Sequence, residues 1–162
     1  QIGLTVSPDD AYLALRGLRT LAVRLECHQR NAQQVAQWLS KQPEVEQVLY
    51  PALPDAPGHA LWKRDFTGAC GLFAVQLRPM AEQAVTAMLD GMNLFGMGFS
   101  WGGFESLILL TNPGKDRTAK PWQGRGPLLR LHIGLENPED LIADLEAGFE
   151  RMRSELGAVC AK

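Results

Sequence analysis

An arginine within an apolar strand is the residue of this sequence most suited to binding a ligand. Residues 128–134 read L-L-R-L-H-I-G, and strand side chains alternate between two faces, so Arg130 and His132 share one face. An arginine there is costly unless it meets an anion, and its planar guanidinium suits a carboxylate held by two hydrogen bonds. The pattern indicates a carboxylate-binding arginine, or else a structural salt bridge to one of the chain's own acids. For His132 it favours a hydrogen-bonded support over proton transfer.

A glycine-rich segment, residues 95–107, precedes this strand and reads F-G-M-G-F-S-W-G-G-F-E-S-L. Glycine allows backbone conformations that other residues avoid and lets other groups approach the main chain closely. Four glycines in so short a stretch are typical of a tight loop after a strand end. Alone, the segment is interpreted as a turn with a core tryptophan. Together with the Arg130 strand, it is interpreted as a loop that holds Ser100 and Trp101 in one conformation.

Other kinds of site are not favoured. His28, His59 and His132 lack the spacing of metal ligands, with each other or with cysteine, so no metal is expected. Cys27 and His28 are adjacent, and adjacent residues of a helix do not face each other, so they are a poor nucleophile pair. The G-M-G sequence is not followed by the helix start that a dinucleotide-binding fingerprint requires. The three scattered cysteines indicate free thiols in a reducing cytoplasm.

Length and composition limit the class of protein. A chain of 162 residues suits one domain with a core of its own. A composition of 46% hydrophobic and 21% charged residues is typical of a soluble globular protein. The net charge of -2 gives no electrostatic reason to expect nucleic acid or an acidic membrane as a partner, and no apolar run is long enough to span a bilayer. Because the first residue is Gln1 and not Met, we expect a piece of a longer protein.

A long helix is predicted near the start of the chain. Ser7 can cap it, Pro8 suits the first helical position, and two aspartates follow in the first turn. No further proline occurs before Pro43, and apolar residues recur at helical spacing. These features predict one helix over residues 8–42, kinked near Gly17 and about 50 Å long. Such a helix exceeds the needs of a small domain, so we expect it to link this domain to a missing one.

The remaining pattern predicts an α+β fold, with helices packed on one face of a mostly antiparallel sheet. Strands are predicted at residues 45–50, 72–77, 107–110 and 128–134, and helical segments at residues 59–66, at 81–91 and from Pro138 onward. Residues 112–127 are predicted to form a loop, and residues 157–162 a loose tail.

Four motifs resemble those of the pyridoxal phosphate (PLP) enzymes of cysteine and methionine metabolism, and the resemblance runs from about residue 11 to residue 152. They are R-G-L-R-T-L (16–21), W-K-R-D-F-T-G (62–68), S-W-G-G-F-E-S-L (100–107) and L-R-L-H-I-G-L-E (129–136). The resemblance implies that residues 1–162 form the small C-terminal domain of an aspartate-aminotransferase-like, fold type I PLP enzyme. It also implies that the cofactor lysine and the phosphate-binding loop lie in a preceding domain, and that no catalytic or cofactor-binding residue lies in this chain.

Within the family, the resemblance is strongest to the β-lyases that split cystathionine. It implies that Arg130 binds the α-carboxylate of an amino-acid thioether substrate. It further implies that Ser100, through its backbone and hydroxyl, helps to position that carboxylate or the catalytic lysine. Trp101 would pack beside the arginine and shape the pocket, with His132 as support. Phe99 is assigned to the same support, but it stands where these β-lyases carry tyrosine, so any hydrogen bond made by that hydroxyl is missing here.

The implied activity of the complete protein is PLP-dependent β-elimination of cystathionine to homocysteine, pyruvate and ammonia, a step of methionine biosynthesis. The implied enzyme is a cytoplasmic homotetramer, and this chain alone is expected to be inactive and to hold no PLP. Two alternatives stay open. One is a γ-lyase, γ-synthase or sulfhydrylase of the same family, although these tend to carry leucine at the position of Trp101. The other is a non-catalytic binding or oligomerisation module, against which the Arg130 strand counts.

Overall fold

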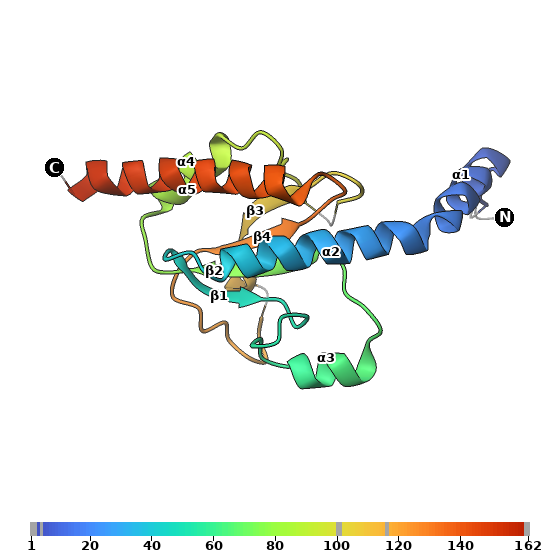
Figure 1. Cartoon of the computed structure of the whole chain (residues 1–162), viewed down its shortest axis with the longest axis horizontal. Helices are drawn as coiled ribbons and strands as arrows, with labels where there is room; N and C mark the ends of the chain where they lie inside the picture. The colour runs from blue at the N-terminus through green and yellow to red at the C-terminus, as the bar shows by residue number, and fades with distance from the viewer. Residues whose placement is uncertain (1–2, 4, 100–101, 116, 161–162) are drawn as a thin grey trace.

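A four-stranded antiparallel sheet with helices packed on one face forms the body of the computed structural model, which describes residues 3, 5–99, 102–115 and 117–160 (Figure 1). The elements in chain order are α1 (Pro8–Arg19), α2 (Leu21–Leu39), β1 (Val45–Leu49), α3 (His59–Asp65), β2 (Leu72–Leu77), α4 (Glu82–Asp90), β3 (Leu107–Thr111), the short 3-10 helix η1 (Pro113–Lys115), β4 (Leu128–His132) and α5 (Pro138–Cys160). The predicted α+β class and antiparallel sheet are confirmed, and the four strands lie within two residues of their predicted bounds.

The strand order of the sheet is β1-β2-β4-β3, and each neighbouring pair is antiparallel. Strand β4 is therefore an inner strand. Its middle residue, Arg130, pairs with Ala74 of β2 on one side and with Leu109 of β3 on the other. Because paired residues point to the same face of a sheet, these three side chains form one row across it.

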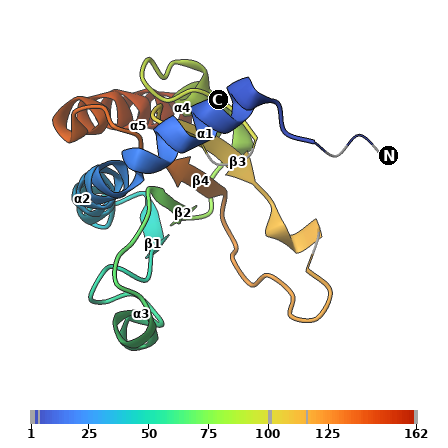
Figure 2. The same cartoon turned by 90° about the vertical axis from the view of Figure 1, so that its right-hand side faces the viewer.

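The core lies between one face of the sheet and the helices α2, α4 and α5. Figure 2 shows these three helices together on one side of the sheet, with α3 apart from them near β1. The alternation predicted for β2 and β4 is confirmed, because the side chains of one face are all less than 5% exposed. They are Phe73, Val75, Leu77, Leu129 and Leu131. The facing helices bury the apolar stripes that include Val35, Ala36, Val85, Met88, Leu141, Leu145 and Phe149.

The single helix predicted over residues 8–42 is wrong in its continuity and in its end. The structure has two helices, α1 and α2, with Thr20 between them in a non-helical conformation (φ -111°, ψ 9°). The carbonyl of Gly17 accepts hydrogen bonds from the Thr20 N–H (3.3 Å), the Thr20 hydroxyl (3.3 Å) and the Arg24 guanidinium (2.7 Å). Side-chain donors of this kind compete with the helical ladder, so the kink expected near Gly17 is a full break three residues later.

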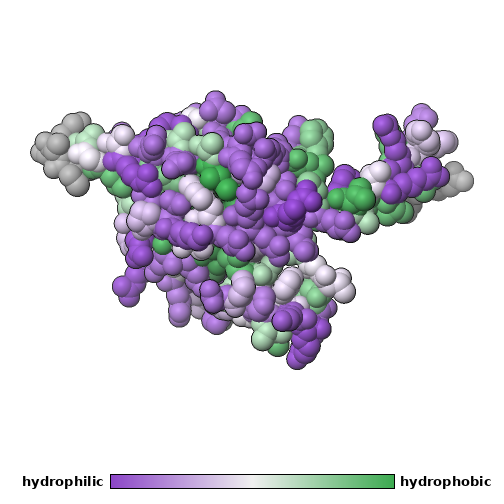
Figure 3. Space-filling model, viewed as in Figure 1, coloured by the Kyte–Doolittle hydropathy of each residue, from purple (hydrophilic) through white to green (hydrophobic). Residues whose placement is uncertain are grey.

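Helix α1 contains no buried residue and projects from the body of the molecule (Figure 1). Its large apolar side chains are exposed, among them Tyr12 (66%), Leu13 (57%) and Leu18 (65%). Hydrophobic side chains are visible along this projection in Figure 3. An apolar surface of this kind is typical of a contact with another folded surface.

The loose tail predicted for residues 157–162 is wrong for its first four residues, because α5 continues to Cys160. Met152 is fully buried and Leu156 packs against the core, so the helix stays anchored almost to its end. No proline interrupts the sequence between Pro138 and that end. Among the described residues, no helix combines the length and the apolar character needed to cross a bilayer.

Candidate functional site

Arg130 lies half-buried at the centre of the second face of the sheet, the face that does not carry the helical core. Its row neighbours Ala74 and Leu109 are also half-buried. The Arg130 Nη2 atom lies 3.5 Å from the carbonyl oxygen of Gly98, in the glycine-rich segment. The structure thus brings together the two stretches that carry the sequence hypothesis, which are about 30 residues apart in the chain.

The glycine-rich segment leaves the edge of the sheet and returns to the same place. Gly96 forms a parallel bridge with Leu107. The Gly96 N–H donates to Ser106 O (3.0 Å), and the Ile108 N–H donates to Gly96 O (3.0 Å). The chain therefore leaves the sheet at Gly96 and returns to it at Ser106, in agreement with the tight loop that the glycine content predicts. Ser100 and Trp101, the two residues of this segment that carry the site hypothesis, lie outside the described residues.

The Phe99 side chain is 90% exposed in this chain. It lines a shallow hollow of about 370 Å³ together with apolar residues of the same segment and of β3, such as Met97 and Leu109. Its ring therefore faces outward from this domain. The support role assigned to Phe99 from the sequence remains a prediction.

His132 joins β4 to the glycine-rich segment. Its Nε2 lies 2.9 Å from the carbonyl oxygen of Gly103. A carbonyl only accepts hydrogen bonds, so this nitrogen carries the proton. Gly102 allows the close approach, because a Cβ atom there would lie 2.7 Å from His132 Cδ2. The support role expected for His132 thus has a specific hydrogen bond behind it, although its contribution to activity remains a prediction.

A second buried histidine, His28 of α2, packs against His132 with 5.2 Å between the ring centroids. Its Nδ1 lies 2.7 Å from Ile133 O, and by the same argument it donates. From its sequence context, His28 is neither a metal ligand nor a nucleophile partner of Cys27. The apolar spacing around His28 predicts a helix, but it gives no sign that this helix meets the end of β4.

Glu136 fixes the last turn of the glycine-rich segment, although the sequence pattern predicts no role for this residue. The Glu136 carboxylate accepts hydrogen bonds from the Ser106 N–H (2.7 Å) and the Ser106 hydroxyl (2.8 Å). Ser106 is fully buried, and its Oγ also accepts the Gly134 N–H at 2.9 Å. Both residues belong to the motifs that carry the family resemblance, which is the only signal in the sequence that singles them out.

Burial makes the stability of this region dependent on pH. Desolvation lowers the pKa of His132 below its ordinary value of 6.5, the hydrogen bond to Gly103 raises it, His28 lowers it and Glu136 raises it, with a net downward shift. Between the folded and unfolded pKa values the unfolded chain holds more protons, so the free energy of unfolding rises with pH. We expect the His132 contribution to be complete above about pH 6.5 and to be lost as the pH falls through the folded pKa.

Urea unfolding of the wild type and of His132→Gln at pH 7.5, 6.5 and 5.5 measures this dependence. The wild type should lose more stability between pH 7.5 and 5.5 than the variant, which has no imidazole at this position. Equal slopes in the two proteins would show that His132 does not titrate differently on folding.

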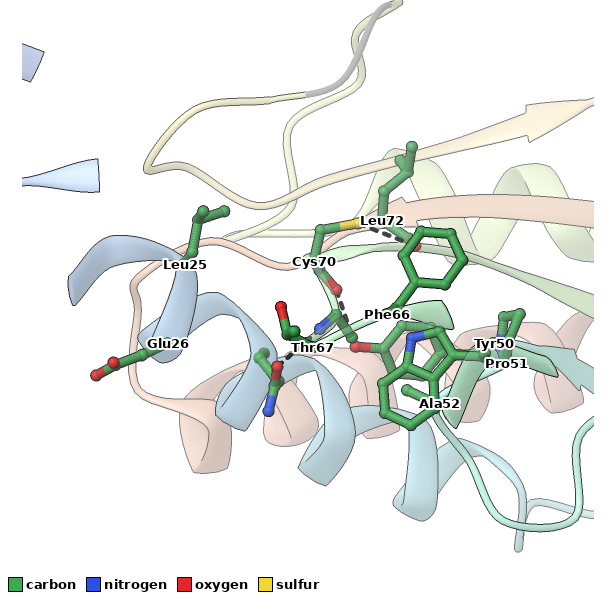
Figure 4. A pocket seen from close by; sticks show the side chains of 13 residues that line it. Leu25, Glu26, Tyr50, Pro51, Ala52, Phe66, Thr67, Cys70 and Leu72 are labelled. Atoms are coloured by element: carbon green, nitrogen blue, oxygen red, sulfur yellow. Dashed lines mark hydrogen bonds between the residues drawn. The ribbon is translucent and has the colours of Figure 1, made fainter. Parts of the chain in front are cut away.

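A separate hollow of about 570 Å³ opens between the start of α2, the end of β1 and α3 (Figure 4). Its walls are mainly apolar and include Trp62, and Figure 4 shows Tyr50 and Phe66 on one side and Leu25 on the other. The Tyr50 hydroxyl donates to the Cys70 carbonyl at 2.9 Å, and burial raises the pKa of this phenol. The described residues that line this hollow do not include Arg130 or His132, so it is distinct from the candidate site. Among the described residues, no group of three or more histidine, cysteine or acidic side chains could hold a metal ion.

The sequence profile of a family described as Cys/Met metabolism PLP-dependent enzymes matches residues 1–150. The chain belongs to this family. A cystathionine β-lyase of Bordetella avium is 51% identical over 151 residues, which are 93% of this chain and 38% of that protein. A cystathionine β-lyase of Escherichia coli K12 is 49% identical over 156 residues, 93% of this chain and 39% of that protein.

Solved structures of the family share the fold. One is a cystathionine γ-synthase of Xanthomonas oryzae pv. oryzae, solved in complex with cystathionine. It matches this chain with a TM-score of 0.79 at 42% identity, and the match covers 94% of this chain and 41% of the γ-synthase chain. The predicted family and fold are therefore confirmed. The chain spans 38% and 39% of the length of the two β-lyases, and it corresponds to the C-terminal part of these enzymes.

Proposed function

We propose that this chain is the substrate-orienting C-terminal part of a PLP-dependent lyase that cleaves cystathionine by β-elimination. The products of that reaction, homocysteine, pyruvate and ammonia, account for cystathionine and one water molecule. The observation that carries the proposal is the position of Arg130, half-buried in the middle of an apolar strand and beside the glycine-rich segment. The β-lyase relatives, at about half identity across this domain, support it.

In this proposal Arg130 binds the α-carboxylate of the substrate through its two-pronged guanidinium. A half-buried position strengthens the attraction, because the field of the charge is screened less than in water. Ser100 contributes a hydroxyl and its backbone to the same carboxylate or to the catalytic lysine. Trp101 shapes the pocket, Phe99 supports it, and His132 holds the segment that bears them. Fixing the carboxylate in this way sets the direction of the α-proton relative to the base that removes it.

The lysines whose side chains the structure describes do not fit the task of holding PLP. A cofactor lysine must sit in a water-excluded pocket near the bound substrate, whereas the described side chains of Lys41, Lys63 and Lys120 are exposed. We therefore place the cofactor lysine in the part of the protein outside this chain. When bound there, PLP supplies an electron sink that lets the α-proton leave and the β-carbon–sulfur bond break.

A γ-lyase, γ-synthase or sulfhydrylase of the same family is the second candidate, and the γ-synthase whose structure contains cystathionine supports it. Trp101, where these enzymes tend to carry leucine, favours the β-lyase. A cytoplasmic location agrees with free thiols at Cys27 and Cys70. For the complete protein we also propose assembly into a homotetramer. We further propose that its substrate is an amino-acid thioether.

The product pattern of the complete gene product, incubated with PLP and cystathionine, tests the proposal. A β-lyase releases pyruvate and the thiol homocysteine in equal amounts, whereas a γ-lyase releases cysteine and 2-oxobutyrate. We expect pyruvate and homocysteine from the complete protein and neither from residues 1–162 alone. Borohydride treatment of this chain with PLP should trap no stoichiometric adduct on one lysine. Release of 2-oxobutyrate, or of no keto acid at all, would contradict the β-lyase assignment.

A further inference from the structure

Two carboxylates hold the two ends of the loop that faces Arg130. At its start, Asp144 of α5 accepts the Asn93 N–H (3.0 Å to each carboxylate oxygen) and the Leu94 N–H (2.7 Å). At its end, Glu136 accepts both the N–H and the hydroxyl of Ser106. The two ends of the segment, near Asn93 and at Ser106, are thus hydrogen-bonded to two carboxylates. Both carboxylates come from one short stretch of the chain, residues 136–144.

These contacts lie in a partly buried setting, where hydrogen bonds to a charge are stronger than in water. Asp144 is 7% exposed and Ser106 is 0% exposed. Burying a carboxylate is costly unless its oxygens accept hydrogen bonds, and bonds from N–H groups to an ionised oxygen are about twice as strong as neutral ones. The loop carries the matching donors at both ends. Removing the Glu136 carboxylate would leave the N–H of the buried Ser106 without its acceptor, and removing the Asp144 carboxylate would do the same to the part-buried N–H groups of Asn93 and Leu94.

Between its two fixed ends, the described part of the loop lies against β4 at two points. The carbonyl of Gly98 is near Arg130 Nη2 (3.5 Å), and the carbonyl of Gly103 accepts from His132 Nε2 (2.9 Å). The end of the loop is further tied to the residues after β4, because the Leu135 N–H donates to Phe104 O at 2.8 Å. The position of the loop backbone beside Arg130 therefore depends on where its two ends are anchored.

We propose that Glu136 and Asp144 are positioning residues of the substrate site, acting through the described stretches 93–99 and 102–106 to set the backbone beside the Arg130 guanidinium. This inference rests on the proposed carboxylate-binding role of Arg130. The hydrogen bonds of the two acids go to Asn93, Leu94 and Ser106, so their effect passes through the backbone that these residues belong to. A binding group that is held in place before the substrate arrives loses less in orientation when it binds.

Amide hydrogen exchange of this chain tests whether the two carboxylates stabilise the loop locally. Glu136→Gln keeps the size of the side chain but removes the charge and turns one acceptor into a donor. Exchange in peptides covering residues 102–106 should become about tenfold faster or more, as loss of a charge-assisted bond implies, while β2 and α5 keep their rates. Asp144→Asn should act in the same way on residues 93–96. The matched control is Glu139→Gln, since Glu139 is an exposed acid of α5, the helix that also carries Asp144. Within the described residues, its carboxylate accepts a hydrogen bond from Gln34 and none from the loop.

Kinetics of the complete gene product test whether anchoring of the loop by these carboxylates contributes to activity at the Arg130 site. Glu136→Gln should lower kcat/KM for cystathionine about tenfold at unchanged PLP content, and Glu136→Asp should recover part of it. In an Arg130→Ala background the same Glu136→Gln change should cost little more, because the loop then has no arginine to position. A purely structural role predicts instead an unchanged kcat/KM for the folded single variant, and this result would also overturn the proposal. An effect on kcat/KM that does not pass through Arg130 predicts losses that multiply in the double variant.

The outcomes separate the two proposals. Faster exchange confined to the loop, with losses that do not multiply, supports positioning. Unchanged exchange in the loop, or exchange that rises throughout the sheet, overturns it, as do multiplying losses. If the wild-type gene product cleaves no cystathionine, the proposed function fails, whereas the exchange measurement still decides whether these acids hold the loop.

Discussion

Replacement of Arg130 by alanine in the complete gene product is expected to lower kcat/KM for cystathionine about 100-fold or more. The loss corresponds to about 3 kcal/mol for a charge-assisted hydrogen-bonded pair that is missing in the transition state. The PLP content and the melting temperature should stay at their wild-type values, because Arg130 lies on the second face of the sheet and outside the apolar core. Steady-state kinetics and a thermal melt on the same preparation measure both quantities.

Two comparisons separate substrate binding from a structural ion pair. Arg130→Lys keeps the charge but loses the planar pair of donors, so its activity should be intermediate at best. A substrate analogue that lacks the α-carboxylate should react at similar rates with the wild type and with Arg130→Ala, because the contact is already absent. A variant that melts well below the wild type, or that is equally impaired toward the analogue, would make Arg130 a structural residue.

Replacement of Gly134 by alanine is expected to lower the free energy of unfolding by about 3 kcal/mol, the upper end of the usual cost of overpacking. A Cβ atom at this position would overlap the Phe104 carbonyl oxygen and the Glu136 carboxylate, and would lie 2.8 Å from the Glu105 carbonyl carbon. The obstructing atoms are mainly backbone, which cannot rotate away. Urea unfolding of residues 1–162 measures the change.

Gly103→Ala is the matched control for this substitution, since a Cβ atom at Gly103 would meet no heavy atom within 4 Å. Its free energy of unfolding should stay within about 0.5 kcal/mol of the wild type, as for surface changes in general. If both glycines tolerate alanine equally, the close packing between the end of β4 and the glycine-rich segment is absent in solution. If both are equally destabilised, the loss reflects the loop backbone and not the contact at Gly134.

The secondary structure of this chain was largely predictable because its signals are local. The alternation in residues 128–134 predicts a strand with Arg130 and the core leucines on opposite faces, and the structure confirms it. The continuous helix over residues 8–42 failed for a reason that spacing cannot reveal. Side-chain donors from Thr20 and Arg24 take the Gly17 carbonyl, and a count of apolar positions does not register such competition.

Arg130, His132 and the glycine-rich segment could be singled out from the sequence, and their described parts lie together in the structure. The acids that hold the neighbouring segment could not be predicted. Glu136 and Asp144 are two acids among 18 in the chain, and nothing in their local pattern separates them from solvated ones. Their role arises from a loop that begins at Asn93 and closes next to its own start, a contact set by the tertiary fold.

Helix α1 has a thermodynamic consequence beyond its shape. A helix of 12 residues without a buried side chain is marginal in water, because little besides the hydrogen bond from Arg24 to Gly17 offsets the cost of ordering its backbone. The first buried residue of the helical stretch is His28, so the unit that unfolds cooperatively begins within α2. Any surface that covers Tyr12 and Leu18 therefore stabilises the α1 helix as it binds, and part of its binding free energy goes into ordering that segment. The helicity of α1 is in effect a measure of how often its apolar side is covered.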